Sequence, residues 1–288
     1  MNILEVRGLT HVYSKGTPFE RTAIEDLNFS VQPGEFLGVI GHTGSGKSTM
    51  VQHLNGLVKP TSGQVLLDGV DIWEKPDQIR ALRFRVGLVF QYPEYQLFEE
   101  SVYKDIAFGP RNMGLSEEEI DSRVREAAEL CGVSDALLTR SPFELSGGQK
   151  RRVAIAGVLA MQPEVLIMDE PTAGLDPQGR DEILSRVRRY HEQRGATVLL
   201  VSHSMEDVAR HATGVLVMEH GRIAVHGSVA EVFSQEQRLS ELGLAVPQVT
   251  AIFAKLARAG LPVPTDVFTV EQGEDALRRL LQERGVIA

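Results

Sequence analysis

The chain has 288 residues, of which 42% are hydrophobic and 24% are charged, a composition typical of a globular protein with one large α/β domain and an appendage, or with two modest domains. Its formal net charge of −9 argues against non-specific binding to nucleic acid, which requires a basic surface. We find no apolar run long enough for a membrane helix and no signal-peptide pattern in the first residues, and the single cysteine excludes internal disulfides and suits a reducing cytosol.

The first informative element is a short apolar run, Phe36–Ile40, which predicts a buried strand. It leads into the pattern G-x-x-x-x-G-K-S of a phosphate-binding loop, formed by Gly41, His42, Thr43, Gly44, Ser45, Gly46, Lys47 and Ser48. A helix is predicted next, at residues 49–57. In such a loop Lys47 would bridge the β- and γ-phosphates of a nucleotide and Ser48 would hold Mg²⁺. The alternative is a glycine-rich turn between a strand and a helix, without a ligand.

Three further apolar runs also end in polar residues: residues 86–90 lead to Gln91, residues 165–168 to Asp169 and Glu170, and residues 197–201 to Ser202 and His203. Continuous apolar runs separated by helical patterns predict a parallel sheet with helices on both sides. Ligands of such sheets bind beyond the carboxyl ends of the strands. We therefore expect Lys47 and the polar residues after these strands to gather at one edge.

The pair Asp169 and Glu170 ends a hydrophobic strand, where two adjacent charges are costly without a cation. Mg²⁺ would offset this cost if Asp169 bound it through water, and Glu170 could then act as general base toward an attacking water. His203 could donate to the γ-phosphate. Taken singly, the acidic pair could be an ordinary loop and His203 an incidental surface histidine.

A second candidate anion site is the sequence Leu145, Ser146, Gly147, Gly148 and Gln149, which opens a helical pattern at residues 150–161. Ser146 is a good N-cap, and the two glycines leave the first amides of the helix uncovered. A flexible turn is the alternative. Asp176 and Pro177 likewise have the pattern of an N-cap and first residue, for a helix at residues 178–194.

The last sixty residues contain no nucleotide motif. Short amphipathic helices are predicted at Val229–Phe233, at residues 246–259 and at Val270–Glu283. Gly260, Pro262 and Pro264 separate the second of these from the third.

Over residues 1–227 the sequence resembles the ATP-binding-cassette (ABC) ATPases. The matching features are the phosphate loop GHTGSGKST, the Q-loop residue Gln91, the signature LSGGQ, the Mg²⁺-binding strand VLIMDE, the D-loop AGLD, the switch residue His203 and the adenine-stacking residue Tyr13. The D-loop has Ala173 where the family usually has serine. The resemblance implies an α/β fold with a parallel core sheet, an antiparallel β subdomain and a helical subdomain at about residues 92–163. Residues 228–288 would then form a C-terminal helical extension that helps to hold a dimer together; the alternative is a cap on its own domain without a partner.

This resemblance also implies a head-to-tail dimer with ATP and Mg²⁺ as cofactors. The nucleotide would contact Tyr13, Gly41, His42, Thr43, Gly44, Ser45, Gly46, Lys47, Ser48 and Thr49. The implied Mg²⁺ ligands are Ser48, Gln91 and Asp169, and the implied catalytic residues are Glu170, His203 and Gln91. Leu145, Ser146, Gly147, Gly148, Gln149 and Asp176 would act on the nucleotide of the other subunit. Hydrolysis would then open the clamp, since the γ-phosphate holds its two sides together.

Within this family, residues 91–116 resemble the ATPases of energy-coupling-factor (ECF) importers, which share Q-x-P-E-x-Q-L-F followed by D-I-A-F-G-P-x-N. Residues 54–65 resemble the same branch, and the motif QYPEYQLFEE with residues 242–250 resembles the second of its two paralogous ATPases. The resemblance implies ATP-driven uptake of vitamins or metal ions. The implied partners are a paralogous ATPase, a transmembrane coupling subunit and substrate-binding membrane components, with this chain peripheral at the cytoplasmic side of the cell membrane.

The same segment mixes aromatic residues with the acids Glu94, Glu99, Glu100 and Asp105. We expect these acids and aromatics to form a docking groove for cationic helices of the membrane subunit. Alternatively, Tyr92, Phe98 and Phe108 pack the helical subdomain. At the level of function, the alternatives are the ATPase of another ABC transporter, a soluble ABC ATPase acting on nucleic acid or ribosomes, and a nucleotide-sensing scaffold without turnover.

Overall fold

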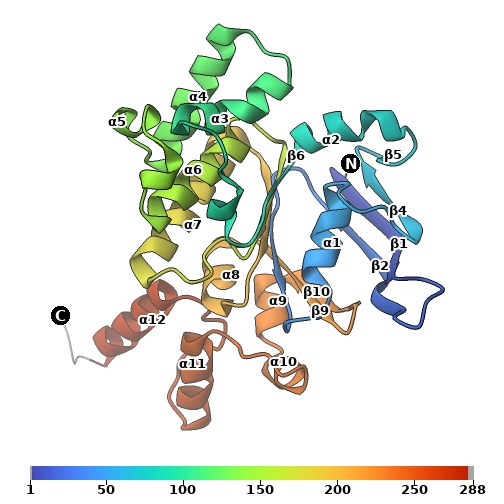
Figure 1. Cartoon of the computed structure of the whole chain (residues 1–288). Coiled ribbons are helices and arrows are strands. Elements are labelled where there is room, and N and C mark those ends of the chain that lie inside the picture. The colour runs from blue at the N-terminus through green and yellow to red at the C-terminus, as the bar shows by residue number, and fades with distance from the viewer. Residues whose placement is uncertain (1, 285–288) are drawn as a thin grey trace.

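A six-stranded sheet forms the centre of the molecule in the computed structural model, which describes residues 2–284 (Figure 1). Its order is β10-β9-β3-β8-β7-β6, with the bounds β3 (Phe36–Ile40), β6 (Val86–Val89), β7 (Val165–Asp169), β8 (Thr197–Val201), β9 (Gly214–Glu219) and β10 (Arg222–Ser228). Only β10 is antiparallel to its neighbour. Every residue of β3, β6, β7 and β8 is buried, as predicted for strands covered on both sides.

The register of this sheet brings the carboxyl ends of its strands to one level. Val201 at the end of β8 pairs with Asp169 of β7 on one side and with Val39 of β3 on the other. Val89 of β6 pairs with Met168. The segments that follow these strands therefore meet at one edge, and the predicted parallel sheet is confirmed.

A smaller antiparallel sheet, β2-β1-β4-β5, covers the phosphate-loop helix α1 (Lys47–Leu54) and is drawn mainly in blue in Figure 1. Its strands are β1 (Leu4–Tyr13), β2 (Arg21–Val31), β4 (Ser62–Leu67) and β5 (Val70–Asp71), and η1 (Pro76–Gln78) and α2 (Ile79–Arg85) follow. Met50, Val51 and Leu54 of α1 share one core with residues of both sheets. The prediction of a helix at residues 49–57 was two to three residues too late. The helix starts directly at the loop's end and stops before Gly56, whose φ is 66°.

The helical subdomain, drawn in green in Figure 1, lies on the opposite side of the central sheet from the antiparallel sheet. It contains η2 (Pro93–Gln96), α3 (Val102–Asn112), α4 (Glu117–Cys131), α5 (Asp135–Leu138), η3 (Pro142–Glu144) and α6 (Gly147–Leu159). These helices share a core with α7 (Pro177–Arg194) and with sheet residues such as Val89 and Leu166. Helix α6 begins at Gly147, three residues before its predicted start, because Ser146 and Gln149 cap it reciprocally.

The C-terminal extension, orange to red in Figure 1, follows α8 (Met205–His211) and the last two strands. Its helices are α9 (Val229–Phe233), α10 (Glu236–Glu241), α11 (Gln248–Arg258) and α12 (Val270–Glu283), of which the sequence analysis missed α10. Phe233 and Leu239 pack into one cluster with Ile40 of β3, whereas Phe253 and Leu280 belong to a second, smaller cluster. Across residues 2–284, none of the helices combines the length and the apolar composition needed to span a membrane.

Candidate active site

Glycine geometry shapes the phosphate loop between β3 and α1. Gly41, Gly44 and Gly46 have φ angles of 149°, 81° and 101°, which residues with a Cβ rarely adopt. A Cβ at Gly41 would also lie 2.3 Å from the carbonyl oxygen of Met218. Gly46 is the N-cap of α1 and has no side chain with which to cap it. The first amides of the helix can therefore face an anion, as the sequence pattern predicts.

The ammonium group of Lys47 folds back onto this loop. Its Nζ donates to the carbonyl oxygens of Gly41 at 2.6 Å and His42 at 2.9 Å, and the residue is buried. Burial lowers the pKa of Lys47, and the carboxylates of Glu170 and Asp169 oppose this effect. A bound phosphate would compete with these carbonyl oxygens for the ammonium group of Lys47.

Asp169, the last residue of β7, is only 6% exposed and provides an unsatisfied acceptor. Ser48 forms a hydrogen bond with its carboxylate, whereas Oδ1 is buried without a hydrogen-bond partner among the described residues. Burial raises the pKa of Asp169, and the hydrogen bond from Ser48 acts in the opposite direction. A bare carboxylate oxygen next to a hydroxyl group is a hard oxygen donor set, which fits Mg²⁺.

Glu170 and His203 are in direct contact. Nδ1 of His203 donates to Oε2 of Glu170 at 2.7 Å; the Glu170 side chain is 15% exposed and that of His203 is 67% exposed. The backbone of Glu170 has a φ of 51°, in the left-handed region that costs a residue with a Cβ about 1–2 kcal/mol. Its N–H donates to the carbonyl oxygen of Val201 at 3.0 Å, which fixes this conformation. The sequence analysis predicted both residues for the site but not the bond between them.

A cavity of about 450 Å³ lies beside the phosphate loop. It is lined by nine of the predicted site residues, namely Tyr13, Thr43, Gly44, Gly46, Lys47, Ser48, Thr49, Gln91 and Glu170. Five lining residues were missed: Arg21, Thr22, Ala23, His220 and Gly221. Arg21 could have been found from a hairpin prediction, since it pairs with Tyr13 across the β1–β2 hairpin.

Tyr13 stands at the end of β1 with its ring 41% exposed. Its hydroxyl lies 3.4 Å from Oγ1 of Thr49, and its ring packs edge-on against His11 at 4.4 Å. The exposed ring at the rim of the cavity is suitable for stacking on a base.

Comparison with known proteins identifies the family. Residues 24–173 match the family model described as ABC transporter. The energy-coupling factor transporter ATP-binding protein EcfA2 of Caldanaerobacter subterraneus subsp. tengcongensis is 53% identical over 279 residues, which cover 97% of this chain and 98% of that protein. Its counterpart from Clostridium perfringens is 52% identical, with 97% and 98% covered. The chain belongs to the ECF transporter ATP-binding proteins of the ABC family.

Solved structures agree with this assignment. The structure of cbiO1 from Clostridium perfringens, described as part of the ABC transporter complex cbiONQ, has a TM-score of 0.75 and 39% identity and covers 90% of this chain and 97% of its own. The ATP-binding cassette MJ0796, dimeric in a post-hydrolysis state with ADP and Pi, has a TM-score of 0.69 and 27% identity, with 78% and 98% covered. The predicted ABC fold and the ECF family are thus confirmed.

The signature of this ECF ATPase lies away from its own cavity. Leu145, Ser146, Gly147, Gly148 and Gln149 are not among the lining residues, and a Cβ at either glycine would meet open space. Asp176 caps α7, because its Oδ1 accepts from the N–H of Gly179 at 2.7 Å, which confirms its predicted structural role. The predicted action of these residues on a second subunit's nucleotide remains a prediction.

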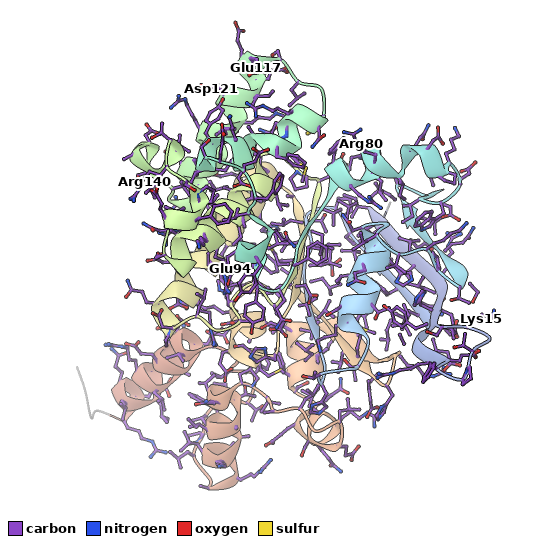
Figure 2. The ribbon with its side chains drawn as sticks, in the orientation of Figure 1. Lys15, Arg80, Glu94, Glu117, Asp121 and Arg140 are labelled. Atoms are coloured by element: carbon purple, nitrogen blue, oxygen red, sulfur yellow. The ribbon has the colours of Figure 1, made fainter. Side chains whose placement is uncertain are left out.

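The prediction that the acids of residues 91–116 face a partner is wrong for two of them. Glu94 forms two hydrogen bonds with Arg151 of α6, at 2.6 and 2.9 Å, and the two side chains are 14% and 4% exposed. Figure 2 shows Glu94 near the middle of the view, whereas Glu117 lies at the tip of the helical subdomain. Asp105 accepts from the N–H groups of Phe98 and Glu99, both at 3.2 Å. Glu94 thus satisfies the buried guanidinium of Arg151, and Asp105 satisfies two backbone N–H groups of its own segment.

Three aromatic residues of this segment face solvent. Tyr95 is 84%, Phe98 58% and Phe108 46% exposed, and the rings of Phe98 and Phe108 are in edge-to-face contact at 4.9 Å. We call these three residues the aromatic patch. Exposed rings of this number on one short segment are typical of an interaction surface.

Proposed function

We propose that this chain hydrolyses ATP in the 450 Å³ cavity as the ATPase subunit of an ECF-type importer, coupling ATP turnover to uptake of vitamins or metal ions through membrane partners. The observation that carries the proposal is the Glu170–His203 contact at the same sheet edge as Lys47 and Asp169. A general base, a phosphate-binding cation and a metal ligand are the groups that hydrolysis of a phosphoanhydride requires. The ECF transporter ATP-binding relatives support the transport role.

Each side chain has one task in this proposal. Lys47 and the loop amides bind the β- and γ-phosphates, and Tyr13 stacks on adenine. Glu170 accepts a proton from the attacking water, while His203 orients its carboxylate and would donate to the γ-phosphate. Mg²⁺ would neutralise charge on the phosphates, with Ser48, Gln91 and, through water, Asp169 holding it.

The variant Glu170→Gln tests the assignment of the base. Loss of a general base lowers turnover by about 10²–10⁴-fold, whereas the isosteric amide should leave the Kd for ATP nearly unchanged. Phosphate release and ATP binding are measured on the full chain and its transporter complex. Glu118→Gln, an exposed substitution on α4, is the matched control and should turn over ATP normally. Normal turnover in Glu170→Gln would remove Glu170 from the mechanism.

The active unit that we propose is a heterodimer with a paralogous ATPase, in which each signature completes the other subunit's site. The position of Leu145, Ser146, Gly147, Gly148, Gln149 and Asp176 outside the chain's own cavity supports this arrangement. The C-terminal extension would add a contact between the two subunits that does not depend on the nucleotide. It presents apolar side chains for such a contact, since Ile252 of α11 and Val270 of α12 are 54% and 71% exposed. Ile252→Glu should weaken association of the purified subunits, while Val70→Glu, on the antiparallel sheet, should not. Equal association of both variants would contradict a contact through the extension.

Docking to a transmembrane coupling subunit, and through it to substrate-binding membrane components, would use the aromatic patch. Since Glu94 and Asp105 are turned inward, we assign recognition to Tyr95, Phe98 and Phe108, with the rings receiving cationic side chains. This contact would place the chain at the cytoplasmic side of the cell membrane. Phe98→Ala should reduce co-purification of the integral subunit from detergent-solubilised membranes, and Phe19→Ala, an 82% exposed ring on the β1–β2 loop, should not. Unchanged recovery with Phe98→Ala would refute this role.

A further inference from the structure

The side chain of His42 connects the phosphate loop to the C-terminal extension. Its Nε2 donates to the carbonyl oxygen of Leu242 at 2.9 Å, between residues 200 positions apart. The next residue, Gly243, has a φ of 67°, and a Cβ there would lie 2.6 Å from the same Nε2. His42 does not line the nucleotide cavity, although its sequence position is inside the loop motif. The ring of His42 therefore contacts the C-terminal extension and does not face the nucleotide cavity.

The backbone of His42 takes part in the network that must change when phosphate binds. Its carbonyl oxygen accepts from Nζ of Lys47 at 2.9 Å and from the N–H of Ser45 at 3.1 Å. A phosphate that attracts the Lys47 ammonium weakens the first of these bonds. The ring contact with Leu242 does not involve Lys47, so it can hold the start of the loop in place while the lysine changes partners.

The acceptor on the extension is itself well fixed. Leu239 and Leu242 are 0% and 6% exposed and pack into one cluster with Ile40, the residue immediately before the loop. The turn after α10 is closed by two backbone bonds, from Gly243 to Ser240 at 2.9 Å and from Leu244 to Leu239 at 2.8 Å. The Leu242 carbonyl is thus positioned before nucleotide arrives.

We infer that His42 is a positioning residue for ATP binding: its ring anchors the phosphate loop to the turn at residues 240–244 and holds the loop in its binding conformation. An anchored loop loses less conformational entropy on binding, so ATP binds more tightly. The coupling is reciprocal, since ATP must stabilise the turn to the extent that the turn favours ATP.

The first test compares His42→Ala with His42→Gln in the full chain. Losing one hydrogen bond of ordinary net strength should weaken ATP binding about three- to tenfold in His42→Ala. Glutamine can present an amide N–H near the position of Nε2, so His42→Gln should restore most of the affinity. The Kd is measured by isothermal titration calorimetry with ATP and Mg²⁺. An unchanged Kd in His42→Ala, or an equal loss in both variants, would overturn the inference.

The second test approaches the same contact from the extension. Gly243→Ala should displace the ring of His42 and weaken ATP binding, and in the His42→Ala background it should cause no further loss of affinity. Gly260→Ala is the matched control, because Gly260 has a similar φ of 87° but open space around its Cβ position. It should lower the melting temperature without changing the Kd. Independent, multiplicative effects of His42→Ala and Gly243→Ala on the Kd would refute the coupling.

A third measurement is sensitive to the linkage itself. Amide hydrogen exchange of residues 236–246 should slow on addition of ATP in the unsubstituted chain and should not respond in His42→Ala. A substitution that merely loosened the fold would raise exchange with and without ATP and leave the response to ATP intact. Such an intact response would count against the inference.

Discussion

Replacing Asp169 by asparagine tests two effects of its buried charge: the stability that the charge costs the nucleotide-free chain, and the contribution that it makes to binding of ATP with Mg²⁺. Asp169 is 6% exposed, its Oδ1 is unpaired among the described residues, and burial raises the pKa of its carboxyl group. Asparagine keeps the shape and an acceptor for Ser48 but carries no charge. We predict that Asp169→Asn makes the nucleotide-free chain more stable and abolishes most of the stabilisation by ATP with Mg²⁺.

The magnitude follows from the burial. An unsatisfied buried polar group costs about 1–3 kcal/mol, and more when it is charged. Asparagine leaves a neutral unsatisfied group in place and loses the attraction to Lys47, so the gain comes from the charge alone, and we expect about 1–2 kcal/mol. For a chain of this size that raises the melting temperature by about 2–5 °C. Because the folded-state pKa is raised, the folded chain loses stability as pH rises from the unfolded pKa through the folded pKa. The advantage of the asparagine variant should therefore be small near pH 4 and larger at pH 8.

The assay is thermal unfolding at several pH values, with and without ATP and Mg²⁺. At ATP concentrations about 100 times the Kd, binding should stabilise the unsubstituted chain by about 2.7 kcal/mol, and the variant far less. Asp266→Asn, at an exposed position of the extension, is the control and should change neither quantity. A nucleotide-free variant that is less stable than the unsubstituted chain at pH 8 would refute the reasoning about the buried charge.

Three further outcomes are expected. Glu94→Gln removes the charge partner of Arg151 and should lower the free energy of unfolding by about 2 kcal/mol in urea titrations, and a change below about 0.5 kcal/mol would show that the pair contributes nothing. Burial raises the pKa of the Cys131 thiol to about 12, so iodoacetamide at pH 8 should label it only in denaturant, and rapid labelling of the folded chain would contradict its burial. Gly41→Ala should abolish ATP binding because its Cβ would meet Met218, and calorimetric titration showing a normal Kd would disprove the clash.

The parts of the site that follow strand ends could be predicted from the sequence. Strand, glycine loop and helix occur in unbroken order at Gly41 and Lys47, so local conformation alone places these residues. Glu170 and His203 follow buried apolar runs. The parallel register of β7 and β8 places the two residues side by side, with Nδ1 of His203 2.7 Å from Oε2 of Glu170. In these places local pattern and sheet topology point to the same arrangement.

Contacts that depend on tertiary packing could not be predicted in this way. The sequence around Glu94 gives no sign that its side chain is buried, because its partner Arg151 lies 57 positions later on another helix. Arg21 and His220 enter the cavity from β2 and from the turn after β9, where no motif marks them. His42 had a position in the loop motif, yet the direction of its ring is set by a turn of the extension.

The hydrophobic cluster that joins the extension to the central sheet has a practical consequence. Phe233 and Leu239 are completely buried against the strand that carries the phosphate loop. A protein shortened to residue 227 would expose the apolar surface around Ile40, the residue immediately before the phosphate loop, so its failure to bind ATP would say nothing about pairing between subunits. A truncation after Val246 removes α11 and α12 but also Phe268, a buried member of the same cluster, so it still uncovers part of this apolar surface.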